Sequence, residues 1–160
     1  MKEVKTNAVR KLESLKINFK EYHFDTETAV SGEEVAKILS LDADRVFKTL
    51  VTVGKSGNHY VFMVPVKKEL DLKKAAVAVK EKNIEMIKSK ELLTLTGYVH
   101  GGCSPVGMKK FFKTTVHDTA QHFDTIIFSG GKIGYQIELG LSELSKAIEL
   151  NTADIIREEA

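Results

Sequence analysis

The sequence predicts an α+β protein in which short strands and short helices follow one another along the chain. Two kinds of segment support this prediction. Runs rich in β-branched and aromatic residues, such as Val46–Val53 and Tyr60–Val66, have the composition of strands. Other segments place apolar residues at helical spacing behind residues that commonly begin helices. We expect at least about five short strands and about four or five helices.

Length and composition limit the class of protein. The chain has 160 residues, of which 42% are hydrophobic and 29% charged, so we expect a single folded domain over residues 1–160 with a buried core. A net charge of +2 is mild, and contact with nucleic acid would need a local basic patch. The apolar runs are too short to cross a bilayer, and no signal-peptide pattern is present. A single cysteine cannot form an internal disulfide, so we expect a cytoplasmic protein.

The first part of the chain is predicted to form a helix, a strand and a second helix. Apolar residues recur at helical spacing over residues 3–17, which is typical of an amphipathic helix. Alternation over Phe19–Phe24 predicts a short strand, and residues 25–30 are expected to form a loop. Ser31 followed by Glu34 is the pattern of a capping box, so the simplest role of Ser31 is to begin the next helix.

A predicted β-hairpin follows, and its first strand contains a lysine among apolar residues. The two strands named above flank Gly54–Asn58, which has turn chemistry. By the two-residue period of a strand, Lys48 shares a face with Val46 and Leu50, and both faces are apolar. A buried ammonium is costly unless it meets an anion. Lys48 is therefore either an anion-binding residue or a side chain that extends past its neighbours to solvent.

The remaining segments are predicted to alternate between helices and strands. Asp71 is expected to cap a helix whose lysines form a solvated face. Further helices are expected over Ser89–Leu95, Leu141–Leu150 and Ala153–Arg157. Further strands are expected over Glu85–Ile87, Thr114–His117, Thr125–Ser129 and Ile133–Leu139.

The segment Thr96–Lys110 is rich in glycine and contains the single cysteine of the chain. It holds four of the eleven glycines and one of the two prolines. Glycines let another molecule approach the main chain closely. Backbone N–H groups in such a loop suit a small molecule or the end of a nucleic acid. A plain structural turn is the alternative that composition leaves open.

Common catalytic and cofactor motifs find little support in this sequence. A Cys103 nucleophile with His100 or His117 stays open, but one cysteine and several histidines often occur together by chance. A metal held by His117, Asp118 and His122 would lack a standard ligand spacing. The glycine pairs do not have the spacing of a Walker or dinucleotide-binding motif. We therefore expect neither a metal nor a cofactor.

Three blocks of the sequence resemble, in order, the YbaK family of free-standing aminoacyl-tRNA editing domains. They are Val46–Leu50, Thr96–Lys110 and Ser129–Gly134. The best-known branch of that family acts as a Cys-tRNA(Pro) deacylase, and a related domain is inserted in bacterial prolyl-tRNA synthetases. The resemblance extends over essentially the whole chain. It implies a mixed, mostly antiparallel sheet that curves toward a barrel and is surrounded by helices.

The resemblance also implies a pocket for the 3′ end of an aminoacyl-tRNA, with Lys48 as its indispensable catalytic residue. The implied substrate-binding residues are Tyr22, Ser31, Thr49, Gly101, Gly102, Ser104, Ser129 and Gln136. In the cysteine-specific branch the substrate's own thiol is thought to attack its ester carbonyl, so Cys103 need not be catalytic. Prolyl-tRNA synthetase is a candidate partner, and the oligomeric state stays open.

Three positions depart from the Cys-tRNA(Pro) branch of the family. Ser31 stands where phenylalanine is common, Ile133 where arginine is common, and Gln136 where aspartate is common. The sequence therefore predicts an aminoacyl-tRNA deacylase for Cys-tRNA(Pro), with Cys-tRNA(Cys) as a second candidate substrate. The alternatives are a deacylase for another mischarged tRNA, such as Ala-tRNA(Pro), and a non-catalytic module that binds aminoacyl-tRNA or a synthetase.

Overall fold

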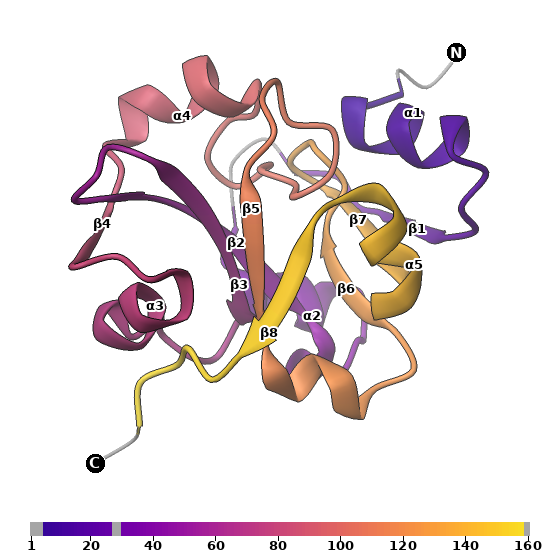
Figure 1. The fold of residues 1–160 in the computed structure, drawn as a ribbon. Coiled ribbons are helices and arrows are strands. Elements are labelled where there is room, and N and C mark those ends of the chain that lie inside the picture. Colours follow the sequence, from indigo (N-terminus) through magenta and orange to yellow (C-terminus); the bar gives the residue numbers. More distant parts are fainter. Residues whose placement is uncertain (1–4, 27–29, 159–160) are drawn as a thin grey trace.

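A computed structural model describes residues 5–26 and 30–158, which form a mixed α+β fold (Figure 1). The α-helices of this described part are α1 (Asn7–Ser14), α2 (Gly32–Ile38), α3 (Leu72–Val79), α4 (Ser89–Thr96) and α5 (Leu141–Ala147). The 3₁₀ helices are η1 (Ala43–Arg45) and η2 (Asp118–His122). The strands are β1 (Lys20–His23), β2 (Phe47–Gly54), β3 (His59–Pro65), β4 (Ile84–Met86), β5 (Lys113–His117), β6 (Ile126–Ser129), β7 (Tyr135–Leu139) and β8 (Leu150–Ala153).

Two of the predicted helix starts have the side-chain caps that the sequence indicated. The Ser31 hydroxyl accepts a hydrogen bond from the backbone N–H of Glu34 at the start of α2. The Asp71 carboxylate accepts hydrogen bonds from the backbone N–H groups of Lys73 and Lys74 at the start of α3. These bonds satisfy donors that have no partner within the first helical turn. The capping predictions are therefore confirmed.

The strands form two sheets with mixed pairing. One sheet has three strands in the order β1-β7-β6, all antiparallel. The other has five strands in the order β4-β2-β3-β5-β8. Its β2–β3 and β2–β4 pairs are antiparallel, whereas its β3–β5 and β5–β8 pairs are parallel. The predicted mixed and mostly antiparallel arrangement is confirmed, but the described strands do not close into a complete barrel.

The two sheets meet where β2 enters the larger sheet. Val46, the residue before β2, forms an isolated parallel bridge with Ile127 of β6. Both side chains are buried, and they pack with Ala36 of α2 and with Val66 after β3. This small cluster fixes the sheets to one another and places α2 over the junction. Other positions of β2 and β6 are thereby brought close together.

The main core lies on the other face of the junction. Phe47, Phe128 and Ile137 are buried there and pack with residues of α1, α5 and η2. A second cluster lies between the larger sheet and α3, and includes Phe62 and Val64. The central strands β2 and β3 thus have covered side chains on both faces, because successive side chains point to opposite sides.

The end of the chain differs from the sequence prediction. Helix α5 ends at Ala147, and Leu150–Ala153 forms β8, parallel to β5. Ala153–Arg157 is not a helix, because Ile155 is fully buried and Ile156 bridges to Leu70. Burial of Ile155 and pairing with the sheet outweigh the weak helical preference of this short segment.

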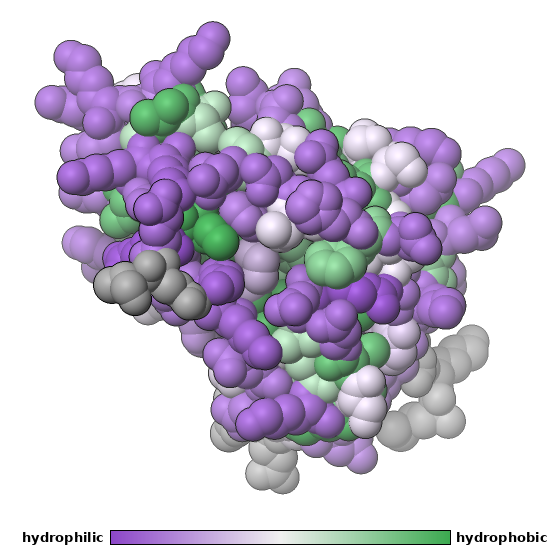
Figure 2. Space-filling view, turned by 90° about the horizontal axis from the view of Figure 1, so that it is seen from below, coloured by the Kyte–Doolittle hydropathy of each residue, from purple (hydrophilic) through white to green (hydrophobic). Residues whose placement is uncertain are grey.

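No helix in the described part of the chain is long and apolar enough to cross a membrane. Figure 2 shows the lower face of the molecule, which is mainly hydrophilic and exposes hydrophobic side chains in small separate areas.

Candidate functional site

Three of the predicted site residues lie in one row across the three-stranded sheet. Tyr22 of β1 is the direct partner of Gln136 in β7, and Gln136 is the direct partner of Ser129 in β6. Directly opposed residues of a sheet point to the same face. The three side chains therefore lie side by side, although Tyr22 is more than 100 positions away from the other two along the chain.

Lys48 continues this row on the neighbouring sheet. The bridge between Val46 and Ile127 is parallel, and Lys48 and Ser129 lie two residues further along their strands. Side chains two positions apart on a strand share a face. Lys48 therefore points to the same side of the junction as Ser129. We call Tyr22, Gln136, Ser129 and Lys48 the polar row.

The ammonium of Lys48 is partly open to solvent. Lys48 lies between Val46, which packs under α2, and Leu50, which packs with the cluster under α3. Its side chain is 29% exposed, and Nζ lies 3.4 Å from Oε1 of Glu69. Glu69 is itself 71% exposed, so this ion pair is weak. Of the two interpretations of Lys48, the structure favours a side chain that extends past apolar neighbours to solvent. Its contact with the exposed Glu69 does not bury the charge.

Ser31 lies at the start of the helix that covers the junction. Its hydroxyl accepts from the N–H of Glu34 and donates to Oε1 of the same residue at 3.1 Å. The next residue, Gly32, lies so close to Val66 that an added Cβ would be 2.1 Å from Cγ1 of Val66. The structure thus gives Ser31 a capping role beside the end of β3.

Thr49 lies on the face of β2 opposite to Lys48. It shares that face with Phe47 and Val51, which are buried in the clusters on that side. Its Oγ1 is buried and has no hydrogen-bond partner within the described residues. The two neighbouring residues of the predicted site are therefore separated by the sheet, and Thr49 does not join the polar row.

The predicted glycine loop packs against the turn that follows β6. An added Cβ on Gly102 would lie 3.0 Å from the backbone N of Ile133 and 3.1 Å from the carbonyl carbon of Lys132. Gly101 has a φ of +85°, a conformation that favours glycine. In Figure 1 the loop lies between α4 and α1, near the end of β6 that carries Ser129. A side chain at position 102 would therefore press against the backbone of this turn.

Ser104 and Cys103 have buried structural surroundings. The Ser104 hydroxyl is fully buried and accepts a hydrogen bond from the N–H of Val106 at 3.3 Å. The Cys103 side chain packs with Val51 and Tyr98. Burial raises the pKa of the Cys103 thiol to about 12, so the thiol is protonated at neutral pH. This disfavours Cys103 as a nucleophile, because the thiolate is the reactive form.

The structure adds a group that the sequence did not single out. Glu138 of β7 is 8% exposed and accepts hydrogen bonds from Tyr22 and Thr125. Nη2 of Arg45 lies 2.8 Å from Oε2 of Glu138 and also contacts the Thr125 hydroxyl. This role of Glu138 could not be recognised in the sequence, because a glutamate at an exposed position of a strand produces the same alternating pattern.

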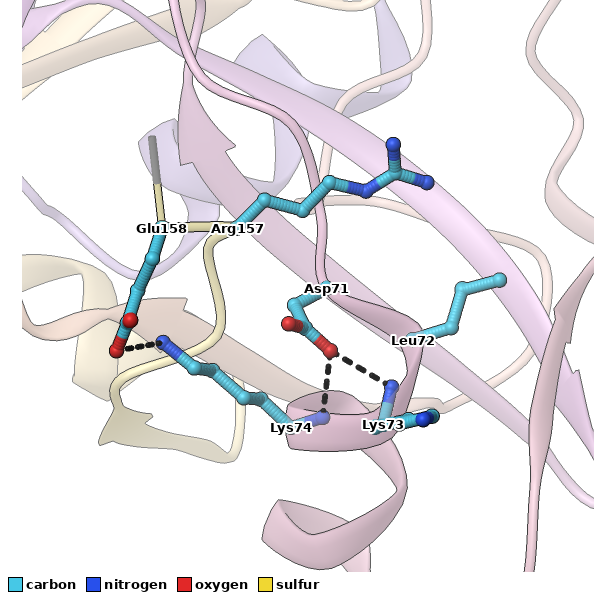
Figure 3. Close-up of a pocket in the computed structure, with 6 residues that line it drawn as sticks. All are labelled: Asp71, Leu72, Lys73, Lys74, Arg157 and Glu158. Atoms are coloured by element: carbon cyan, nitrogen blue, oxygen red, sulfur yellow. Dashed lines mark hydrogen bonds and ion pairs between the residues drawn. The ribbon is translucent and has the colours of Figure 1, made fainter. Parts of the chain in front are cut away.

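Three open cavities lie away from the polar row. The largest, about 660 Å³, lies at the start of α3 and is lined by Asp71, Leu72, Lys73, Lys74, Arg157 and Glu158 (Figure 3). A second is lined by His59 and residues of α4, and a third lies beside His117. In Figure 3 the Lys74 ammonium points toward Glu158, and Asp71 caps the helix. None of the predicted site residues lines these three cavities.

Comparison with known proteins gives one family. Residues 26–147 match the family described as the aminoacyl-tRNA editing domain. The chain is 45% identical over 156 residues to EbsC of Enterococcus faecalis, whose name provisionally assigns it as a Cys-tRNA(Pro)/Cys-tRNA(Cys) deacylase. That alignment covers 97% of this chain and 95% of the relative.

Solved structures share the fold at lower sequence identity. A protein provisionally described as a trans-editing enzyme for prolyl-tRNA synthetase superposes with a TM-score of 0.84 and 24% identity, over 98% of this chain and 100% of that one. The hypothetical protein APE2540 superposes with a TM-score of 0.85 and 20% identity, over 94% and 99%. These matches agree with the α+β architecture. The family match covers β2, β6 and β7, and the alignment with EbsC extends over nearly the whole chain. The chain therefore belongs to the aminoacyl-tRNA editing domain family.

Proposed function

We propose that this protein is an aminoacyl-tRNA deacylase that removes cysteine from Cys-tRNA(Pro), with Cys-tRNA(Cys) as a second substrate. The observation that carries this proposal is the 45% identity to EbsC over nearly the full length of both chains. The polar row is the site we assign to this activity, with Lys48 at one end and Tyr22 at the other.

The chemistry of the substrate is compatible with these residues. An aminoacyl ester is already activated, so correct positioning and charge stabilisation can accelerate its cleavage without a protein nucleophile. The partly exposed ammonium of Lys48 suits the terminal phosphate or the reacting carbonyl oxygen. The buried, protonated thiol of Cys103 supports a mechanism in which this residue has no catalytic role.

Cysteine on the tRNA can supply the nucleophile itself. Its thiol sulfur would attack the carbonyl carbon of its own ester, so that a C–S bond forms as the C–O bond to the ribose breaks. The thiol proton ends on the released ribose oxygen, and water later opens the cyclic thioester. Cysteine would then be selected by the reactivity of its thiol. Shape alone would select weakly, because an apolar pocket binds side chains that differ by one small group with free energies only about 1–3 kcal/mol apart.

A panel of charged tRNAs tests this proposal. Cysteine, alanine and proline are each placed on tRNA(Pro), and cysteine also on tRNA(Cys), and loss of the ester is followed with and without the protein. We expect rapid loss of cysteine from both tRNAs, a cyclic thioester as the first product, and little loss of alanine or proline. Equal rates for alanine and cysteine would contradict the thiol-assisted mechanism. Tight binding without acceleration of any substrate would instead identify a binding module.

The place of action and the partner are also part of the proposal. We place the protein in the cytoplasm, where charged tRNA is used, and propose prolyl-tRNA synthetase as its partner because that enzyme would produce Cys-tRNA(Pro). Addition of the synthetase should then raise the rate of cysteine removal at low tRNA concentration. An unchanged rate would refute the partnership while leaving the deacylase activity in place.

A further inference from the structure

Glu138 holds the hydroxyl of Tyr22 in a fixed direction. The Tyr22 hydroxyl lies 2.5 Å from Oε1 of Glu138. The other carboxylate oxygen, Oε2, accepts from the Thr125 hydroxyl at 2.6 Å and from Nη2 of Arg45 at 2.8 Å. Both oxygens of a buried carboxylate are therefore engaged by donors, and Tyr22 is the donor to Oε1 among the residues that the structure describes.

The position of the shared proton follows from this geometry. Burial alone would raise the pKa of Glu138, but hydrogen bonds from Thr125, Tyr22 and Arg45 outweigh it and lower the pKa. The pKa of Tyr22 is raised, mainly by its hydrogen bond to Glu138. The carboxylate is thus ionised, and the proton stays on the Tyr22 oxygen and points at Glu138. The free lone pair of that oxygen can only accept a hydrogen bond.

This constraint lies at one end of the polar row. Gln136, beside Tyr22, is neutral, and Lys48 at the far end presents a cation. A ligand lying along the row would therefore meet a positive charge at Lys48 and a hydrogen-bond acceptor at Tyr22. An aminoacylated 3′ end carries groups of both kinds: phosphates that suit Lys48, and an ammonium and a ribose hydroxyl that donate hydrogen bonds.

We propose that Glu138 is a positioning residue that commits the Tyr22 oxygen to accept a hydrogen bond from the substrate. The donor is either the free α-ammonium of the amino acid or the 2′-hydroxyl of the terminal ribose. This inference rests on the proposed deacylase function.

The substitution Glu138→Gln reverses the direction of the hydrogen bond. Arg45 and Thr125 both need an acceptor at the position of Oε2, so the amide oxygen of the new side chain is held there. Its NH₂ group then faces Tyr22 and donates to the phenolic oxygen. The Tyr22 proton turns outward, toward the substrate's own donor. Thr125→Val is the matched control, because it removes one donor to Glu138 and leaves the bond to Tyr22.

The test measures deacylation of three substrates by wild type, Tyr22→Phe, Glu138→Gln, the double variant and Thr125→Val. The substrates are Cys-tRNA(Pro), its 3-mercaptopropionyl analogue, which keeps the thiol and lacks the α-ammonium, and a form that ends in 2′-deoxyadenosine. We expect Tyr22→Phe and Glu138→Gln each to lose about tenfold in kcat/KM on Cys-tRNA(Pro), the scale of one hydrogen bond to a charged group. The double variant should be no slower than the slower of the two, and Thr125→Val should stay within about threefold.

The modified substrates identify the donor. If the ammonium is the donor, the losses disappear on the 3-mercaptopropionyl substrate and persist on the deoxy substrate. If the ribose hydroxyl is the donor, the pattern is reversed. Equal losses on all three substrates, accompanied by lower melting temperatures, would overturn the proposal and leave Glu138 a structural residue. A wild-type protein that cleaves none of the substrates would refute the proposed function instead, so the two failures are distinguishable.

Discussion

Replacement of Lys48 separates its contribution to activity from its contribution to stability. Lys48→Met keeps most of the apolar stem and removes the ammonium. The lost ion pair joins a lysine side chain that is 29% exposed to a glutamate side chain that is 71% exposed, with Nζ and Oε1 3.4 Å apart. Such pairs stabilise proteins by less than about 1 kcal/mol, so the melting temperature should fall by less than about 4 °C. Loss of a group that stabilises developing charge should lower kcat about 10²–10³-fold.

The assay is deacylation of Cys-tRNA(Pro) under single-turnover conditions, beside thermal unfolding of the same preparations. Glu69→Gln is the control, because it removes the other half of the ion pair and leaves the ammonium. We expect that variant to keep at least wild-type activity, since Lys48 becomes free for the substrate. Lys48→Arg should not restore activity, because the guanidinium fork is larger than a compact ammonium. If Lys48→Met retained activity within about fivefold of wild type, Lys48 would have no role in the chemistry.

Three further predictions concern other parts of the molecule. Cys103→Ala should keep most of the deacylase activity, and alkylation of native protein at pH 7.5 should be slow, because burial raises the thiol pKa to about 12. A loss of deacylase activity near a thousandfold in this variant would indicate covalent catalysis. Gly107→Ala should lower the free energy of urea unfolding by more than about 2 kcal/mol, because the φ of Gly107 is +77° and the new Cβ would lie 2.7 Å from the backbone of Asn7. An unchanged unfolding midpoint would contradict this packing. Glu138 has a lowered pKa in the fold, so its stabilisation is complete above its ordinary pKa of 4.5, begins to fall below that value and is lost as pH falls through the lower pKa of the folded state. The stability difference between wild type and Glu138→Gln should therefore shrink from pH 6 to pH 3, and a constant difference would refute this reasoning.

The sequence identified elements whose signals are local. Ser31 and Asp71 are both caps in the structure, because an N-cap bond is made within one helical turn and needs no distant partner. The hairpin of β2 and β3 was likewise marked by its turn residues. By contrast, β8 has only four residues, Leu150–Ala153, and exists because β5 offers a parallel partner. No local pattern contains that information.

The candidate site shows the same division between local and distant information. Lys48 was identified by an unusual cation in an apolar strand, and family resemblance added Tyr22, Ser129 and Gln136, which the sheets bring into one row. The separation of Thr49 from Lys48 follows from strand alternation and was available from the sequence period. The role of Glu138 could not be predicted from this period, because it depends on contacts across strands.

The parallel pairing of β8 has a consequence for how the protein is made. Strands β2 and β3 can pair as soon as both have left the ribosome, but one edge of β5 stays open until Leu150–Ala153 has been synthesised. Open strand edges are the places where nascent chains aggregate or pair wrongly. The tertiary structure is thus completed late in translation, after the residues of the polar row have already been synthesised. A chain that stalls or terminates between Gln136 and Leu150 would contain every residue of that row and yet expose an unprotected sheet edge, which we expect chaperones and proteases to recognise.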